Sequence, residues 1–232
     1  MKIKIRKDLN GQIIPYKPIE AFNVWYPTRD KTQIASYKWG TVDKHILQQI
    51  LFHYTNEDDY VVDIMSGRGY TKNICLGMKR KCDMFDIDPQ VAGVIKHDAT
   101  KMFDFKYIDK YDFGYWDAPY FDLKVKDAFD NDVNKFYTFI SDCAKNLKEI
   151  IKMNGRIAFV MCDKNIGEFQ PLCEECYNIL KNVGFKWVQT ISAPLLPQQN
   201  SYMGALISKV RRKERMPLGI RRVIYIFERV SI

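Results

Sequence analysis

Four consecutive residues, Asp117-Ala118-Pro119-Tyr120, carry groups that could activate an amine on a nucleobase. Such an amine is a poor nucleophile because its lone pair is delocalised into the ring. The Asp117 carboxylate and the carbonyl of Ala118 or Pro119 could each accept one N–H, which favours a pyramidal nitrogen whose lone pair points at an electrophile. Proline stiffens the turn by fixing φ, and Tyr120 could stack on the base. The tetrapeptide by itself also fits an ordinary loop.

A second group of residues has the spacing of a nucleotide site. Gly67 and Gly69 bracket Arg68 in a turn after a short apolar run, where glycines let the backbone approach a ligand closely. Asp86 follows 19 positions after Gly67, the spacing at which a βαβ unit places an acid on the two ribose hydroxyls. Lys72 stands where the dinucleotide fingerprint has its third glycine. The turn alone fits any α/β protein. Three acids at expected strand ends favour a ligand site: Asp63, Asp86 and Asp98.

These residues need a sheet whose strands end at one edge. Apolar runs predict seven strands with helices between them, which indicates an α/β fold with a mostly parallel sheet and an antiparallel strand at its C-terminal edge. The helices are expected from a cap at 41 or 43 to 54, near 76–78, at 133–153 with Asn154-Gly155 ending it, and at 168–182. The strands are expected at 60–64, 82–87, ahead of Asp98, and at 113–116, 156–161, 185–191 and 223–229.

The turn and the tetrapeptide together resemble the S-adenosylmethionine-dependent amino-methyltransferases, above all the DNA adenine-N6 methyltransferases. The cofactor loop D-P-F-x-G-x-G of that family stands here as residues 63–69, with Met65 in place of Phe. The D-P-P-Y motif stands here as residues 117–120, with Ala118 in place of the first Pro. The resemblance covers roughly residues 37–192 and implies a Rossmann-like, seven-stranded methyltransferase sheet.

The resemblance also implies roles for individual residues. Asp117, Pro119 and Tyr120 would be catalytic, and the sulfonium methyl group would pass directly to the amine without a covalent enzyme intermediate. Asp86 would bind the ribose, and Asp98 would face the adenine of the cofactor. Trp39 would line the methionine end, although it fits a core position equally well. The implied cofactor-binding residues are Asp63, Met65, Ser66, Gly67, Gly69, Asp86, Ile87, Asp98, Ala99 and Trp39.

Length and composition indicate one domain with a sizeable core, because the chain has 232 residues of which 47% are apolar. No apolar run reaches the about eighteen residues of a membrane span. The N-terminal segment MKIKIRKDLNGQ lacks the apolar core of a signal peptide. We therefore expect a cytoplasmic protein, or a nuclear one if the host has a nucleus. The six scattered cysteines are expected as reduced thiols.

The net charge of +8 suits a polyanionic partner such as nucleic acid. The N-terminal arm, residues 1–36, is expected to be irregular, with Trp25 and Tyr26 as anchors onto the body. The loop at 193–222 is long and basic, and we expect it to contact the substrate, although a solvated charged run is the alternative interpretation. The cations expected at phosphates are Arg211, Arg212, Lys213, Arg215 and Arg221, with Arg222 in the same cluster.

The sequence predicts no metal site. Cys173 and Cys176 form a C-x-x-C pair, but a structural zinc ion needs four ligands and no second pair or nearby His pair exists. On a helix this spacing places both thiols on one face, so burial explains them. His45 and His53 are eight positions apart on an expected helix, without an acid pair at metal spacing.

Three functions stay open at this point. The first is methylation of adenine N6 in DNA with S-adenosylmethionine as cofactor. The second is methylation of an exocyclic amine of RNA, on adenine or guanine; cytosine N4 of DNA is a further variant, although Asp at 117, where Ser would suit cytosine, favours adenine. The third is a nucleic-acid-binding subunit without turnover, which the intact Asp117, Pro119 and Tyr120 disfavour. A monomer and a homodimer both fit the sequence.

Overall fold

The protein is built around one mixed β-sheet. Its computed structural model describes residues 6–7, 13–14, 23–25, 44–121, 126–166, 168–194 and 221–231. The strands of the sheet are β3 (Tyr60–Asp63), β4 (Lys81–Asp86), β5 (Ile95–Lys96), β6 (Tyr111–Asp117), β7 (Ile151–Met161), β10 (Phe185–Pro194) and β11 (Arg221–Arg229). Their order across the sheet is β10-β11-β7-β6-β3-β4-β5.

The five strands β3 to β7 are parallel to one another, whereas β11 is antiparallel to both β7 and β10. The predicted seven-stranded, mostly parallel sheet is therefore confirmed, together with the reversed direction of the last strand. That strand lies one position in from the edge, because β10 takes the outermost place.

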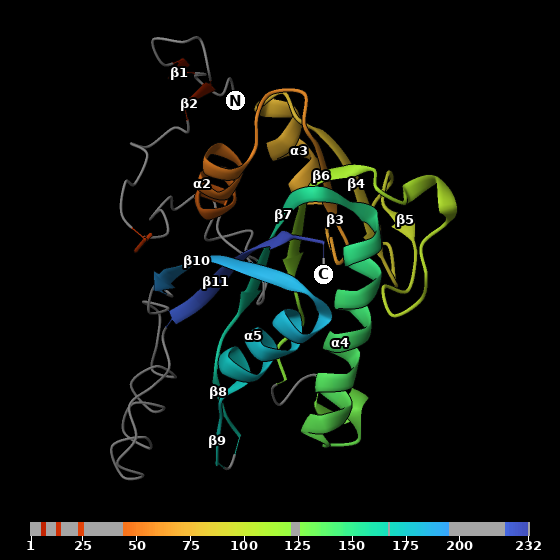
Figure 1. Cartoon of the computed structure of the whole chain (residues 1–232), viewed down its shortest axis with the longest axis vertical. Coiled ribbons are helices and arrows are strands. Elements are labelled where there is room, and N and C mark those ends of the chain that lie inside the picture. Colours follow the sequence, from red (N-terminus) through yellow and green to blue (C-terminus); the bar gives the residue numbers. More distant parts are fainter. Residues whose placement is uncertain are drawn as a thin grey trace.

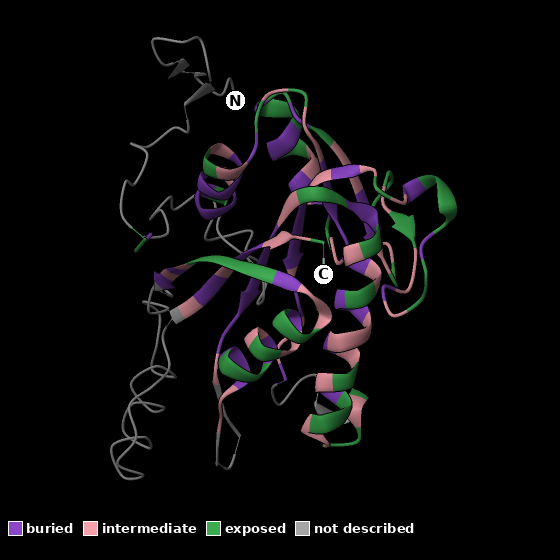
Figure 2. Cartoon of the chain, in the orientation of Figure 1, coloured by how far each residue is buried: buried purple, intermediate pink, exposed green. Residues whose placement is uncertain are grey.

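Helices cover both faces of the sheet (Figure 1). The helices α2 (Lys44–Tyr54) and α3 (Tyr70–Gly77) lie on one face, and α4 (Val133–Ile150) and α5 (Leu172–Val183) lie on the other. Two short 3-10 turns, η1 (Phe105–Tyr107) and η2 (Lys126–Phe129), flank β6 in the chain. Figure 2 shows buried residues running through the central strands and along the inward sides of these helices. The second half of β7, from Ile157 to Met161, is a continuous apolar run because both faces of the sheet are covered there.

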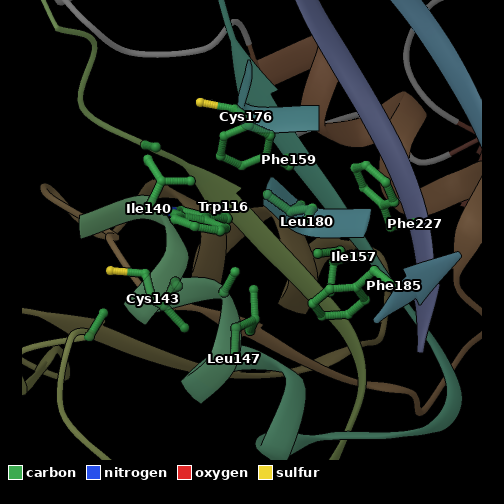
Figure 3. Packing of buried hydrophobic residues seen from close by; sticks show 14 of the residues in the cluster. Trp116, Ile140, Cys143, Leu147, Ile157, Phe159, Cys176, Leu180, Phe185 and Phe227 are labelled. Atoms are coloured by element: carbon green, nitrogen blue, oxygen red, sulfur yellow. The ribbon is translucent and has the colours of Figure 1, made fainter. Parts of the chain in front are cut away.

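The strand β6 lies at the centre of this packing. Trp116 is fully buried on the α4 side, and Tyr115 faces the α2 side. Figure 3 shows Trp116 within the apolar cluster beneath α4. Any larger residue at Gly114 would be too close to its neighbours, because a Cβ there would lie 3.0 Å from side-chain carbons of both Ile151 and Ile157. The close approach of β6 to its neighbours therefore depends on this glycine.

The boundary between α4 and β7 corrects one prediction. The helix ends at Ile150, and β7 begins at once with Ile151, so the expected helix to 153 is wrong. The pair Asn154-Gly155 marks an irregularity inside the strand. Along β6 the register advances from Tyr111 to Phe113, while along β7 it advances from Ile151 to Arg156. Asn154 adopts a positive φ of 64° in this extra stretch, which is why it resembles a helix-ending turn in the sequence.

The start of α5 corrects a second prediction. Residues 168–170, expected at the beginning of this helix, form β9 (Glu168–Gln170), which pairs antiparallel with β8 (Lys164–Ile166) in a small hairpin. Pro171 occupies the position before the helix, where its missing N–H costs no intrahelical hydrogen bond. The helix therefore starts at Leu172, and a hairpin follows the carboxyl end of β7.

The N-terminal arm, expected to be irregular, contains a two-stranded sheet of β1 (Arg6–Lys7) and β2 (Ile13–Ile14). Trp25 is an anchor as predicted, since it is 2% exposed and its backbone N–H donates to the Ser192 carbonyl at 2.8 Å. Tyr26, the second expected anchor, lies outside the described residues. No helix in the described part of the chain is long and apolar enough to cross a bilayer.

Candidate active site

Three acids end neighbouring parallel strands at the same edge of the sheet. Asp63 ends β3, Asp86 ends β4 and Asp117 ends β6. Because β3 pairs in parallel with both β4 and β6, the three strand ends lie side by side. The antiparallel strand β11 begins with Arg221 and Arg222, so these residues belong to the same edge. Ligands of open α/β sheets bind at this edge.

Asp63 is buried, with 2% of its surface exposed. Its carboxylate accepts the Thr71 hydroxyl at 2.5 Å and the Met65 backbone N–H at 3.2 Å. Burial raises the pKa of Asp63 to about 7, although these two hydrogen bonds act in the opposite direction. Asp63 therefore connects the end of β3 to the following loop and to α3, and it exchanges a proton near neutral pH.

The loop after β3 depends on its glycines. Gly67 and Gly69 have φ angles of 50° and 69°, in the left-handed region that favours glycine. A Cβ on Gly69 would lie 2.9 Å from Cγ2 of Val91. The N–H and the hydroxyl of Ser66 both donate to the Phe85 carbonyl, at 2.9 and 3.1 Å. The loop is thus held against β4 by backbone contacts, with open space beside Gly67.

The Asp86 carboxylate faces this loop. One oxygen accepts the Gly67 N–H at 2.7 Å, and the other accepts the Asp88 N–H at 2.9 Å. A carboxylate has about four acceptor positions, so about two are left for ligand hydroxyls when the contacts of the described residues are counted. Ile87 exposes 64% of its surface beside this acid. An acid with spare acceptors next to an exposed apolar side chain fits the ribose and base of a nucleoside-type cofactor.

Asp98 follows β5 and is linked to the Asp86 strand end. The His97 N–H donates to the Asp86 carbonyl at 2.9 Å. One Asp98 oxygen accepts both the N–H and the hydroxyl of Thr100, at 3.0 and 2.8 Å. Burial alone would raise the pKa of Asp98, but the bonds from Thr100 outweigh it and lower the pKa. Asp98 is therefore an ionised acceptor at neutral pH, and Ala99 beside it is buried.

Met65 stands where the family that this chain resembles has Phe, and the structure gives a local physical reason for the methionine. The indole Nε1–H of Trp116 donates to the Met65 sulfur at 3.2 Å. Thioether sulfur is a weak acceptor, yet it satisfies a donor that is otherwise enclosed by apolar side chains. A phenylalanine could not accept in this geometry. The departure from the family motif is therefore coupled to Trp116 on the neighbouring strand.

Tyr120 connects the acid of the predicted catalytic stretch to a cation far away in the sequence. Its hydroxyl donates to Asp117 Oδ1 at 3.2 Å and accepts the Nε–H of Arg222 at 2.9 Å. The guanidinium carbon of Arg222 lies 6.0 Å from the centre of the Tyr120 ring. Ala118 is buried and Pro119 is partly buried. The acid, the aromatic ring and the cation are therefore fixed relative to one another, unlike the groups of an ordinary loop.

The surroundings of Asp117, Tyr120 and Arg222 shift the pKa values of these three side chains. Burial raises the pKa of Asp117 to about 6, while Arg222 and the hydrogen bond from Tyr120 act to lower it. Burial and the nearby Asp117 charge raise the pKa of Tyr120, so the phenol keeps its proton. Burial alone would lower the pKa of Arg222, but Tyr120 and Asp117 outweigh it and raise the pKa. At neutral pH Asp117 is mainly ionised and Arg222 is charged.

The structure does not describe every predicted residue. Arg221 opens β11 at the site edge, but its side chain is outside the described part. Arg222, the last member of the basic cluster, donates its Nε–H to the Tyr120 hydroxyl. One signal could have shown this: an antiparallel last strand begins at the ligand edge, so a cation at its start belongs to the site. Predicted residues outside the described ranges are Trp39, Arg211, Arg212, Lys213 and Arg215.

The cysteine pair on α5 is buried in the core. Cys173 is 5% exposed, and Cys176 is fully buried in the apolar cluster shown in Figure 3. The Cys173 backbone N–H donates to the Asp163 carboxylate at 2.9 Å. Among the described residues no group of three or more His, Cys, Asp or Glu side chains could hold a metal ion.

No protein-family model matches the chain, and no curated protein matches it. Solved structures do. The chain is similar to a SAM-dependent methyltransferase from Methanosarcina mazei, with 14% identity over 79% of this chain and 98% of that chain, and a TM-score of 0.52. It is also similar to a putative methyltransferase from Bacillus halodurans C-125, with 12% identity, coverages of 82% and 99%, and a TM-score of 0.51.

A third similar structure is the 1,6-didemethyltoxoflavin-N1-methyltransferase of Burkholderia thailandensis, solved with 1,6-didemethyltoxoflavin and S-adenosylhomocysteine. The identity is 11%, the coverages are 87% of this chain and 83% of that chain, and the TM-score is 0.53. These likenesses, together with the strand order and the reversed β11, show that the chain has the Rossmann-like fold of class I methyltransferases. The predicted fold class is thereby confirmed.

Proposed function

We propose that the chain is an S-adenosylmethionine-dependent methyltransferase that acts on an exocyclic amine of a nucleobase, adenine N6 in DNA. The observation that carries this proposal is the stretch from Asp117 to Tyr120 at the carboxyl end of β6, where the Tyr120 hydroxyl donates to the Asp117 carboxylate. The methyltransferase fold supports the type of reaction. The net charge of +8 supports a polyanionic substrate.

The cofactor would be held at the exits of β3, β4 and β5. When bound, S-adenosylmethionine supplies an electrophilic methyl group. Asp86 would accept the ribose hydroxyls with its two spare acceptor positions, and Asp98 would accept the adenine amine. The exposed Ile87 and the neighbouring Ala99 would pack against the adenine ring. Gly69 would keep the loop backbone in the conformation that leaves room for the ligand.

The acceptor amine would be activated at the exit of β6. Ionised Asp117 accepts one amine N–H, and the carbonyl of Ala118 or Pro119 accepts the other, so the nitrogen lone pair is turned out of the ring plane. Tyr120 stacks on the base, and its bond to Asp117 fixes the ring relative to the carboxylate. When the nitrogen has bonded the methyl group and the C–S bond to the sulfonium has broken, the nitrogen would carry the positive charge. The Asp117 carboxylate, with a pKa of about 6, could then take one of the two N–H protons.

A small heterocyclic amine is the second candidate substrate. The observation that favours it is the similarity to an N1-methyltransferase of a small molecule, 1,6-didemethyltoxoflavin. The described residues also add only the short β8–β9 hairpin after β7, and no separate recognition domain occurs among them. RNA is a further alternative, because an exocyclic amine of RNA would need the same acceptors at Asp117 and Pro119.

The test is methyl transfer from labelled cofactor to three substrate pools: DNA, RNA and free nucleosides with small heterocycles. The products are digested to nucleosides and identified by mass spectrometry. We expect label in DNA as N6-methyl-2′-deoxyadenosine. Label only in RNA or only in the small molecules would reassign the substrate. Intact cofactor binding without a labelled product in any pool would refute the methyltransferase proposal and favour a binding subunit.

A further inference from the structure

Arg222 occupies an unusual place for a surface cation. It is the second residue of β11, and its neighbour Val223 pairs with Met161 at the end of β7. The strand β7 lies between β11 and β6 in the sheet. To reach the Tyr120 hydroxyl at 2.9 Å, the Arg222 side chain must extend past the end of β7 towards the exit of β6. It therefore points along the site edge and not away from the protein.

The contacts of this side chain lead to Asp117. The Nε–H of Arg222 donates to the Tyr120 hydroxyl, and that hydroxyl donates to Asp117 Oδ1 at 3.2 Å. A phenol has one proton to give and lone pairs to accept with, so both bonds form at the same time. The cation and the anion are thus joined through one neutral group. Asp117, Tyr120 and Arg222 are all partly buried, so removing the cation would leave a carboxylate that is partly shielded from water without its opposite charge.

Other ionisable groups facing this pair do not supply a positive charge. Asp63 on β3 and Tyr115 on β6 both interact electrostatically with Asp117, and Cys162 after β7 interacts with Tyr120. Asp63 repels a second negative charge when it is ionised. Within the described residues that act on Asp117, the opposite charge comes from Arg222.

We infer that Arg222 is a positioning residue of this site, which holds the Asp117 carboxylate ionised and correctly oriented through the Tyr120 hydroxyl. Its catalytic consequence rests on the proposed function. An ionised carboxylate can accept an amine N–H on either oxygen, whereas a protonated one must donate from one of them. Arg222 therefore sets the lowest pH at which the acceptor amine can be bound. The Tyr120 ring is oriented by the same contacts.

The first test does not depend on activity. The pKa of Asp117 in the folded protein, about 6, exceeds its ordinary value of 3.8. The folded state therefore keeps its proton longer than the unfolded state, and stability is lost as the pH rises through this window. Replacing Arg222 extends that loss to higher pH. We expect the Tm deficit of Arg222→Gln to be larger at pH 8 than at pH 5 by about 2–4 °C or more.

Arg156→Gln is the matched control, since Arg156 on β7 forms a partly buried ion pair with Glu228 at 3.1 Å near the opposite end of the strands. Its Tm deficit should be the same at both pH values. A deficit of Arg222→Gln that does not depend on pH would overturn the inference, whether or not the protein transfers methyl groups.

The second test uses the pH dependence of kcat/KM for methyl transfer. We expect Arg222→Gln to move the acid limb of the profile up by about one pH unit or more, with cofactor affinity unchanged. Arg222→Lys should restore the limb in part, because lysine keeps the charge but lacks the planar donor fork. If Arg222 instead binds a phosphate, the variant will raise KM and weaken its salt dependence without moving the limb, which also overturns the inference. If the wild-type protein transfers no methyl group, the proposed function is refuted, and the inference about Arg222 still stands or falls by the Tm measurement.

Discussion

The two halves of the site edge are held together in different ways. The proposed cofactor half, at the exits of β3, β4 and β5, is joined by contacts that are local in the sequence: Thr71 to Asp63 across 8 positions and Gly67 to Asp86 across 19. The proposed acceptor half, at the exit of β6 and the start of β11, depends on a bond between Tyr120 and Arg222 across 102 positions.

The difference in construction implies a difference in sensitivity. In the cofactor half, acids accept backbone N–H groups, so the loop conformation decides whether the site exists. In the proposed acceptor half, partly buried side chains of opposite charge lie close together, so we expect the protonation state to decide whether the site works. Substitutions in the first half should change cofactor affinity and stability, and substitutions in the second should change turnover.

The largest effect is expected from Asp117→Ala in the acceptor half. The variant should lose about 10³-fold in methyl transfer, because the amine loses the acceptor that turns its lone pair towards the electrophile. Cofactor affinity, measured by calorimetry, should stay near that of the wild type. Asp117→Asn is the isosteric control, and it should be more active than Asp117→Ala because its side-chain carbonyl oxygen can still accept one N–H. Near-normal turnover by Asp117→Ala would refute the division between the two halves.

The next effect is expected from Gly69→Ala in the cofactor half. A side chain at a φ of 69° costs about 1–2 kcal/mol, and its Cβ would also meet Val91 at 2.9 Å. We expect lower thermal stability and cofactor binding weakened about tenfold. Gly77→Ala is the matched control on α3, where a Cβ has nothing within 4 Å. It should raise stability by about 0.5–1 kcal/mol. Equal losses in both variants would contradict this explanation.

A pH effect should separate buried Asp63 from partly buried Asp117. The folded-state pKa of Asp63 is about 7, against an ordinary value of 3.8, so the free energy of unfolding should fall between about pH 4 and 7 by at most about 1.4 kcal/mol per unit. Asp117 contributes only up to about pH 6. Asp63→Asn should therefore flatten the slope between pH 6 and 7, measured by denaturant unfolding. A slope in that range identical to that of the wild type would show that another group is responsible.

The smallest effect is expected from Met65→Leu, which removes the acceptor of the Trp116 indole N–H while keeping the side-chain volume. The loss should be about 1 kcal/mol, seen as a fall in Tm of about 2–4 °C. Met161→Leu, at another buried position, should change Tm less. Methyl transfer should persist in both variants. A larger fall in Tm for Met161→Leu than for Met65→Leu would mean that side-chain packing, and not the contact with the sulfur, explains the effect of Met65→Leu.

The same contrast explains what could be predicted from the sequence. Asp63, the glycine pair and Asp86 are close in the chain, and their spacing predicts the turn that the structure contains. The motif at Asp117 was visible for the same reason. The partner of Tyr120 was not, because Arg222 lies within a basic cluster and only the direction of β11 brings it to the site. The end of α4 was misplaced because Asn154 takes a turn-like conformation inside a strand.

The most direct test of the central claim is a crystal structure with S-adenosylhomocysteine, in which one distance is measured: from the cofactor sulfur to the Asp117 carboxylate. Attack over about 3–3.5 Å and a hydrogen bond of about 3 Å from the amine to the acid place the two groups within about 8 Å. We expect a distance within about 8 Å, with the adenosine of the cofactor at Asp86 and Ile87. A separation of about 12 Å or more would contradict it, because no single amine could then meet both groups.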